Sequence, residues 1–237
     1  DKFYQRADKL LDHLEKLLPA AQPEPDWQAA IAFRWRRQGQ SGYIQPVTQP
    51  HRITLDTLCG IDEQKRRIDQ NTQQFVQGFS ANNVLLTGAR GTGKSSLIKA
   101  CLNEYAPQGL RLIEVDKADL VDLPDIVDVV AGRAEKFIVF CDDLSFEDGE
   151  PGYKALKSIL DGSVAAATPN VLIYATSNRR HLLPEYMKEN LSYTHTDDGE
   201  VHPGEVVEEK ISLSERFGLW VSFYPFSQDE YLAITAQ

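Results

Sequence analysis

Eight residues from Gly88 to Ser95 carry the clearest chemical signal in the sequence. They match the pattern GxxxxGK[ST] at every defined position. Glycines let the backbone turn tightly and direct its N–H groups at phosphate oxygens. Lys94 offers a cation to the β- and γ-phosphates, and the Ser95 hydroxyl can bind Mg²⁺. We therefore expect ATP to be bound by Gly88, Ala89, Arg90, Gly91, Thr92, Gly93, Lys94, Ser95 and Ser96.

A pair of aspartates, Asp142 and Asp143, directly follows the apolar run Phe137–Cys141. Ligands of a parallel α/β sheet bind at the carboxyl ends of its strands, which is where Asp142 and Asp143 would lie. This is the Walker B arrangement, in which Asp142 holds Mg²⁺ together with Ser95. Asp143 would then polarise the attacking water as a general base. The alternative is that the pair only caps the next helix or is solvated.

Short apolar runs alternate with helical patterns from Leu55 onward, which predicts a parallel sheet buried on both faces. The fold class is therefore α/β, with three layers. The expected strands are Asn83–Thr87, Leu110–Val115, Phe137–Cys141, Val171–Thr176 and Leu219–Phe223. The expected helices between them are Gly93–Tyr105, Leu123–Ala131 and Tyr153–Leu160.

The first 50 residues predict a helical extension and a linker ahead of this core. Residues 3–18 form an amphipathic pattern that Pro19 ends. Its apolar positions are Phe3, Ala7, Leu10, Leu11, Leu14, Leu17 and Leu18. We expect a second helix over Trp27–Arg37, a loop over Gly39–Pro50, and a polar, acidic loop over Thr194–Glu209. The proposed boundaries are 1–50, 51–226 for the nucleotide-binding core, and 227–237 for the start of a lid.

Bulk properties narrow the function classes. The chain has 237 residues and a formal net charge of −10, which argues against a generally basic nucleic-acid-binding surface. No apolar run approaches the ~20 residues of a membrane span, and no signal-peptide pattern is present, so we expect a cytoplasmic protein. Cys59, Cys101 and Cys141 form no CxxC pair, so neither a zinc site nor a disulfide framework is indicated.

Three further segments resemble those of AAA+ ATPases, and they occur in the order of that family. Leu58–Lys65 is similar to the segment that encloses the adenine, which implies contacts from Leu58 and Ile61. Thr176–Asn178 resembles sensor 1, in which Asn178 would orient the attacking water. Leu213–Gly218 resembles the box that carries the arginine finger, so Arg216 would reach the γ-phosphate of a neighbouring subunit.

More narrowly, the phosphate loop, CDDLSFE and LSERFGLW resemble a bacterial AAA+ family known as a predicted ATPase domain of unknown function. The resemblance implies five parallel strands in the order 5-1-4-3-2, and a helical lid that is truncated at Gln237. AAA+ proteins usually have glutamate where Asp143 stands. The shorter side chain implies slow hydrolysis, or participation of Glu147.

Together these features predict Mg²⁺-dependent ATP hydrolysis in a homo-oligomer that remodels a protein or nucleic-acid client. One alternative is an ATP-dependent switch or scaffold with little hydrolysis, and another is a small-molecule kinase on the same loop. The cofactors are ATP and Mg²⁺ in each case. No membrane partner is expected.

Other clusters have both a functional and a structural interpretation. Arg179 and Arg180 are alternative finger residues or a solvated pair. Arg34, Arg36 and Arg37 beside Trp27 and Trp35 could bind nucleic acid, but a packed helix with a basic outer face is favoured. A flexible acidic loop is favoured over a metal site for His195, Asp197, Asp198, His202 and Glu205.

Overall fold

The computed structural model describes Arg6 and residues 24–39, 41–146, 150–161, 168–178, 194–195, 201–202 and 213–227. Arg6 is helical, and the rest of the helix expected over Phe3–Leu18 lies outside the described residues. The same is true of residues 228–237, where the lid was expected to continue. Also outside them are Glu147, Arg179, Arg180, Asp197, Asp198 and Glu205.

Seven strands form one sheet, in the order β2-β1-β4-β5-β6-β3-β9. They are β1 (Ala32–Gln38), β2 (Ser41–Pro46), β3 (Val84–Gly88), β4 (Leu110–Glu114), β5 (Lys136–Cys141), β6 (Val171–Ser177) and β9 (Leu219–Phe223). All neighbours pair in parallel except β1 and β2, which are antiparallel. The five predicted strands are therefore confirmed in the order 5-1-4-3-2, and two more strands extend the sheet beyond β4.

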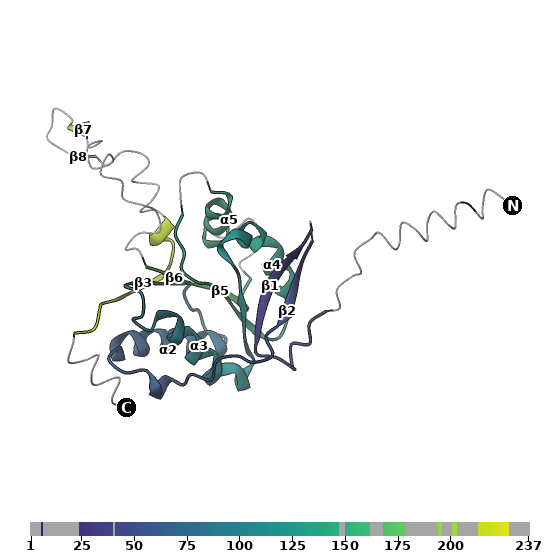
Figure 1. Ribbon diagram of the computed structural model, residues 1–237, viewed down its shortest axis with the longest axis horizontal. Coiled ribbons are helices and arrows are strands. Elements are labelled where there is room, and N and C mark those ends of the chain that lie inside the picture. The colour runs from purple at the N-terminus through teal and green to yellow at the C-terminus, as the bar shows by residue number, and fades with distance from the viewer. Residues whose placement is uncertain are drawn as a thin grey trace.

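Helices cover both faces of the sheet, so the molecule has three layers (Figure 1). On one face lie α2 (Asp62–Val76) and α3 (Lys94–Tyr105), and on the other lie α4 (Leu123–Val130) and α5 (Pro151–Leu160). Three short 3-10 helices are also present, η1 (Leu55–Thr57), η2 (Ala106–Gln108) and η3 (Lys117–Asp122), and residues 213–215 form a single helical turn. None of the described helices is both long enough and apolar enough to cross a bilayer.

Alternating strand residues divide the interior into two cores. In β3, Val84 and Leu86 pack with Ile68 of α2 and Leu97 of α3. Leu85, between them, packs toward the α4 and α5 side. Strands that are buried on both sides in this way read as continuous apolar runs, which is why the sequence revealed them.

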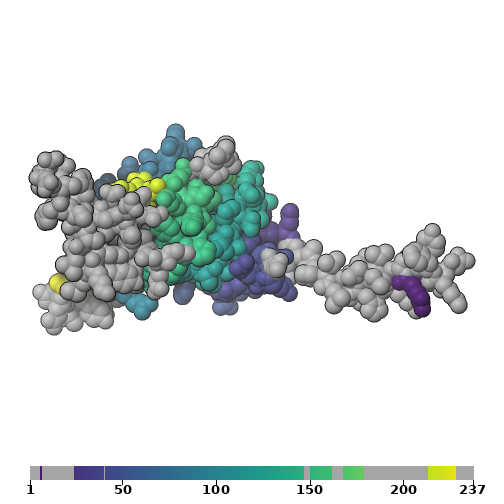
Figure 2. Space-filling model, turned by 90° about the horizontal axis from the view of Figure 1, so that it is seen from above, coloured from purple at the N-terminus to yellow at the C-terminus, as the bar shows by residue number. Residues whose placement is uncertain are grey.

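The helix predicted over Trp27–Arg37 is wrong, because residues 27–29 form a turn and β1 begins at Ala32. Phe33 and Trp35 are buried at a spacing of two, which is the period of a strand. The loop expected over Gly39–Pro50 contains β2, which pairs with β1. Seen from above, the described surface runs from the yellow C-terminal residues through green and teal to the purple residues of these two strands (Figure 2).

The loop expected over Thr194–Glu209 is also partly strand. Its described residues form two short strands, β7 (Thr194–His195) and β8 (Val201–His202), which pair antiparallel. Among the residues that the structure describes, no group of three or more histidine, cysteine, aspartate or glutamate side chains could hold a metal ion.

Candidate functional site

The phosphate loop connects β3, which lies between β6 and the outer strand β9, to the first turn of α3. Gly88 has a φ of 137°, and a Cβ there would lie 2.0 Å from the Phe223 carbonyl oxygen. Only glycine therefore lets β9 pack this closely against the start of the loop. Gly93 has a φ of 92° and is the N-cap of α3, a left-handed conformation that glycine adopts without steric cost.

The amino-terminal end of α3 is available to an anion. Gly93 has no side chain to cap the first turn, so the backbone N–H groups there are left for a ligand. The helix dipole adds a partial positive charge at the same point. Phosphate groups bind at helix termini of this kind.

Lys94 connects the start of the loop to Asn178, which follows β6. Its ammonium donates hydrogen bonds to the carbonyl oxygens of Gly88 and Ala89, both at 2.7 Å, and to Asn178 Oδ1 at 3.1 Å. Burial lowers the pKa of Lys94 below its usual value, and the carboxylates of Asp142 and Asp143 oppose that shift. The ammonium is thus held at the loop, close to two carboxylates.

A chain of short hydrogen bonds connects the serine of the loop to the acidic strand end. Ser95 Oγ donates to Asp142 Oδ1 at 2.6 Å, and Thr176 Oγ1 donates to the same oxygen at 2.5 Å. The Thr176 oxygen also accepts the Asp143 N–H at 2.8 Å. Asn178 Nδ2 in turn donates to Asp143 Oδ1 at 2.5 Å. Hydroxyl and carboxylate oxygens, as in Ser95 and Asp142, are the ligands that Mg²⁺ prefers.

Asp143 has the one positive φ among the described non-glycine residues, 52°. This left-handed conformation is uncommon for residues with a side chain and is often found at functional sites. The bonds to Thr176 and Asn178 hold it in place. Arg90 approaches Asp143 Oδ2 only at 3.4 Å and is largely exposed, so that contact contributes little.

The sequence analysis includes Thr176 only as part of the segment that resembles sensor 1. It does not predict that Thr176 contacts both Asp142 and Asp143. It is 1% exposed at the end of β6, the strand beside β5. A hydroxyl residue at the carboxyl end of a buried strand, just before the polar Ser177 and Asn178, was the available signal.

These side chains surround a cleft of about 200 Å³. The predicted residues that line it are Arg90, Gly91, Gly93, Lys94, Ser95, Ser96, Asp142, Asp143 and Asn178, and Thr176 joins them. Gly88, Ala89, Thr92, Leu58 and Ile61 are not part of its lining. Ile61 is buried close to Gly93, since a Cβ on that glycine would lie 3.5 Å from the Ile61 side chain. Leu58 is half-buried against the α2–α3 core.

Arg216 lies apart from the cleft of its own chain. Its guanidinium forms a close ion pair with Asp161, the C-cap residue of α5. The structure thus brings Lys94, Ser95, Asp142, Asp143 and Asn178 together, but it does not bring Arg216 to them within one chain.

The basic residues of β1 are paired with acids. Arg34 donates to Glu114 at 2.6 Å and Arg36 to Asp116 at 3.2 Å. Arg37 approaches Asp122 at 3.2 Å. These pairs neutralise the cluster that could have bound nucleic acid, and Trp27 and Trp35 are buried rather than available for stacking.

Comparisons with known proteins identify a family for this chain. A family model described as "Protein of unknown function (DUF815)" matches residues 28–237. No curated protein matches the chain.

Solved structures share the fold at low sequence identity. The Thermotoga maritima RuvB Holliday junction branch migration motor is 17% identical, with a TM-score of 0.50, over 77% of this chain and 51% of that chain. Orc1 of Aeropyrum pernix, solved in complex with DNA, is 14% identical, with a TM-score of 0.50, over 77% of this chain and 52% of that one. The chain spans about half the length of each. Both have the AAA+ P-loop fold. The chain therefore belongs to the DUF815 family and has the AAA+ P-loop fold.

Proposed function

We propose that this protein binds ATP with Mg²⁺ in the cleft and hydrolyses it. The observation that carries the proposal is the connected network from Ser95 through Asp142 and Thr176 to Asp143 and Asn178. In this network, the oxygens of Ser95 and Asp142 are suited to bind a divalent cation. They lie beside a second carboxylate, that of Asp143, and next to a loop suited to bind phosphate.

In this proposal each group has one task. The loop amides and Lys94 hold the β- and γ-phosphates, while Ser95 and Asp142 hold Mg²⁺, which would neutralise charge that develops on the phosphoryl oxygens. Asp143 accepts a proton from the attacking water, and Asn178 orients that water. Leu58 and Ile61 face the adenine, as part of a nucleotide-binding core over residues 51–226.

Arg216 would act on the nucleotide of a neighbouring subunit, so the active form would be a homo-oligomer in the cytoplasm. Its separation from the cleft of its own chain supports this role. The energy of ATP hydrolysis would drive the remodelling of a protein or nucleic-acid client. RuvB, a branch migration motor, and Orc1, solved with DNA, make DNA one candidate.

A switch with little hydrolysis is the second candidate, and the conformation of Asp143 favours it. That carboxylate is already engaged by Asn178 and stands on a strained backbone. It is also one methylene shorter than a glutamate. A base held in this way would reach the attacking water less readily.

ATP binding and phosphate release, measured against protein concentration, test both candidates. Lys94→Ala should weaken ATP binding by about ten-fold or more, because charge-assisted hydrogen bonds contribute about 1.5–3 kcal/mol each. Lys154→Ala, an exposed lysine on α5, is the matched control and should change nothing.

The outcomes separate the two candidates. Turnover that rises with protein concentration and is lost in Arg216→Ala supports an oligomeric ATPase. Tight ATP binding with negligible turnover at every concentration supports the switch. Equal ATP binding by the parent and Lys94→Ala would contradict both.

A further inference from the structure

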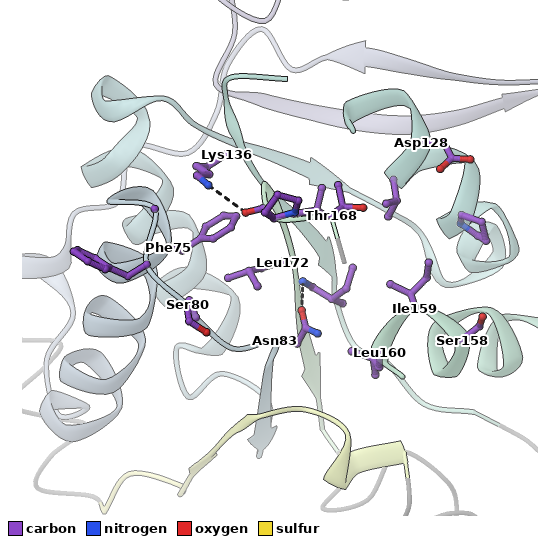
Figure 3. Close-up of a pocket in the computed structure, with 18 residues that line it drawn as sticks. Phe75, Ser80, Asn83, Asp128, Lys136, Ser158, Ile159, Leu160, Thr168 and Leu172 are labelled. Carbon is purple, nitrogen blue, oxygen red and sulfur yellow. Dashed lines mark hydrogen bonds between the residues drawn. The ribbon is translucent and has the colours of Figure 1, made fainter. Parts of the chain in front are cut away.

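A second concavity, of about 800 Å³, lies at the opposite edge of the sheet from the phosphate loop. Lys136 and Val171 begin β5 and β6, Asn83 precedes β3, and all three line it. In Figure 3, Phe75 and Ser80 stand on one side of this groove and Ile159 and Leu160 on the other, with Leu172 between them. We call it the amino-edge groove.

The surface of the amino-edge groove is mainly apolar. Phe79 is 67% exposed at its rim, and Ile159 and Leu160 are half-buried. Apolar side chains exposed in a groove offer a surface that another apolar segment can remove from water.

Two polar side chains in the amino-edge groove already have partners within it. Lys136 Nζ donates to the Pro169 carbonyl at 3.1 Å and lies 5.2 Å from the centre of the Phe75 ring. Asn83 Oδ1 accepts the Ile173 N–H at 2.8 Å (Figure 3). The groove therefore suits a row of apolar side chains better than a charged small molecule.

The N-terminal part of the chain joins the folded body at this same edge. The Trp27 ring packs 4.9 Å from that of Phe137, centre to centre, and Arg133 lies over Trp27 at 5.3 Å. Gln28 Nε2 donates to Glu135 at 3.2 Å. Glu135 precedes Lys136, a residue of the groove wall, so Trp27 and Gln28 hold the N-terminal part of the chain close to the groove.

The sequence ahead of residue 24 supplies a matching occupant. Residues 3–18 predict a helix with a continuous apolar stripe, about 24 Å long at 1.5 Å per residue. The eight residues Pro19–Asp26 can span at most about 28 Å, which keeps that helix within reach of the groove.

We propose that residues 3–18 dock as an amphipathic helix in the amino-edge groove of their own chain. This inference does not depend on the proposed function. A short tether gives an effective concentration on the order of 1 mM, so an intrinsic Kd of about 100 µM keeps the docked form in about ten-fold excess. The occupant is thus a segment of the same chain, and docking should not depend on protein concentration.

Photo-cross-linking of the full chain tests this docking. A benzophenone amino acid at Leu14, on the apolar stripe, should cross-link to the peptides that carry residues 75–83 or 158–173 when the protein is irradiated and digested. The same probe at Asp12, on the opposite side of the predicted helix, should give much less of this product. A mixture of isotopically light and heavy protein tells products within one chain from products between chains.

A substitution in the groove itself tests the docking without changing the position of the cross-linking probe. Phe79→Asp should lower the cross-link yield about ten-fold, because an apolar contact is replaced by a charge. Val129→Asp makes a similar change at an exposed residue of α4 outside the groove and should leave the yield unchanged. The proposal would be overturned by cross-links that form only between chains, by cross-links to other surfaces, or by the absence of any product. Equal yields in Phe79→Asp and Val129→Asp would overturn it as well.

Discussion

Thr176→Val removes one hydroxyl from the centre of the site while nearly preserving the side-chain shape. In the parent, that hydroxyl donates to Asp142 at 2.5 Å and accepts the Asp143 N–H at 2.8 Å. The variant would leave the Asp143 amide without this acceptor and would release one oxygen of Asp142. Both aspartates should therefore lose their fixed positions.

The size of the effect follows from the two bonds. A hydrogen bond to a charged group contributes about 1.5–3 kcal/mol and a neutral one about 0.5–1.5 kcal/mol. Asp142 is exposed enough for water to replace the lost donor, so we expect the free energy of unfolding to fall by about 2 kcal/mol. For a chain of this length that lowers Tm by roughly 4–8 °C.

The functional effect should exceed the loss of stability. Groups that orient metal ligands typically contribute about 10–100-fold to metal affinity. The Mg²⁺ concentration that gives half-maximal ATP binding should rise by that factor in Thr176→Val.

Urea unfolding and Mg²⁺ titrations of ATP binding measure the two effects. Thr176→Ser, which keeps the hydroxyl, is the control and should lose only about 1 kcal/mol for its missing methyl group. A Thr176→Val protein with parental Mg²⁺ dependence and stability would refute the role assigned to the hydroxyl.

Two further perturbations address the core. Tyr174→Phe removes a buried hydroxyl that Asn71 contacts at 3.0 Å and Thr72 at 2.9 Å, so unfolding by urea should show a loss of about 1–2 kcal/mol. Burial raises the pKa of Cys101 and of Cys141 from 9.0 to about 12. Their contribution to stability is therefore complete below pH 9 and is lost as pH rises toward 12, at about 1.4 kcal/mol per thiol per pH unit. Cys101→Ala should show a correspondingly smaller fall between pH 8 and pH 10, and an equal fall would contradict this explanation.

The sequence predicted the elements whose signals are local. The phosphate loop is read from eight consecutive residues, and the five inner strands from apolar runs such as Phe137–Cys141. Their order came from the resemblance to AAA+ proteins, because no local pattern states which strand lies beside which. The carboxyl ends of parallel strands lie at the same side of a sheet. That rule predicts the cluster of Lys94, Ser95, Asp142, Asp143 and Asn178.

The sequence did not predict features that depend on tertiary pairing. Trp27 and Ile31 are spaced as in a helix, whereas Phe33 and Trp35 alternate as in a strand, and only pairing with β4 and β2 decides between them. The hydroxyl of Thr176 acquires its role because β6 lies next to β5. Likewise, the Arg216–Asp161 contact joins residues 55 positions apart and has no local signature.

The two outer strands of the sheet also affect how this protein can associate. An open strand edge invites pairing with another chain, which leads to aggregation. At the β9 edge, Gln64 of α2 donates to the Ser222 carbonyl at 3.1 Å and Arg67 to that of Trp220 at 3.3 Å. At the other edge, β2 ends in Pro46, which has no N–H to donate. With one edge hydrogen-bonded to a helix and the other ended by a proline, self-assembly of this chain should occur through side-chain surfaces and not through the joining of sheets.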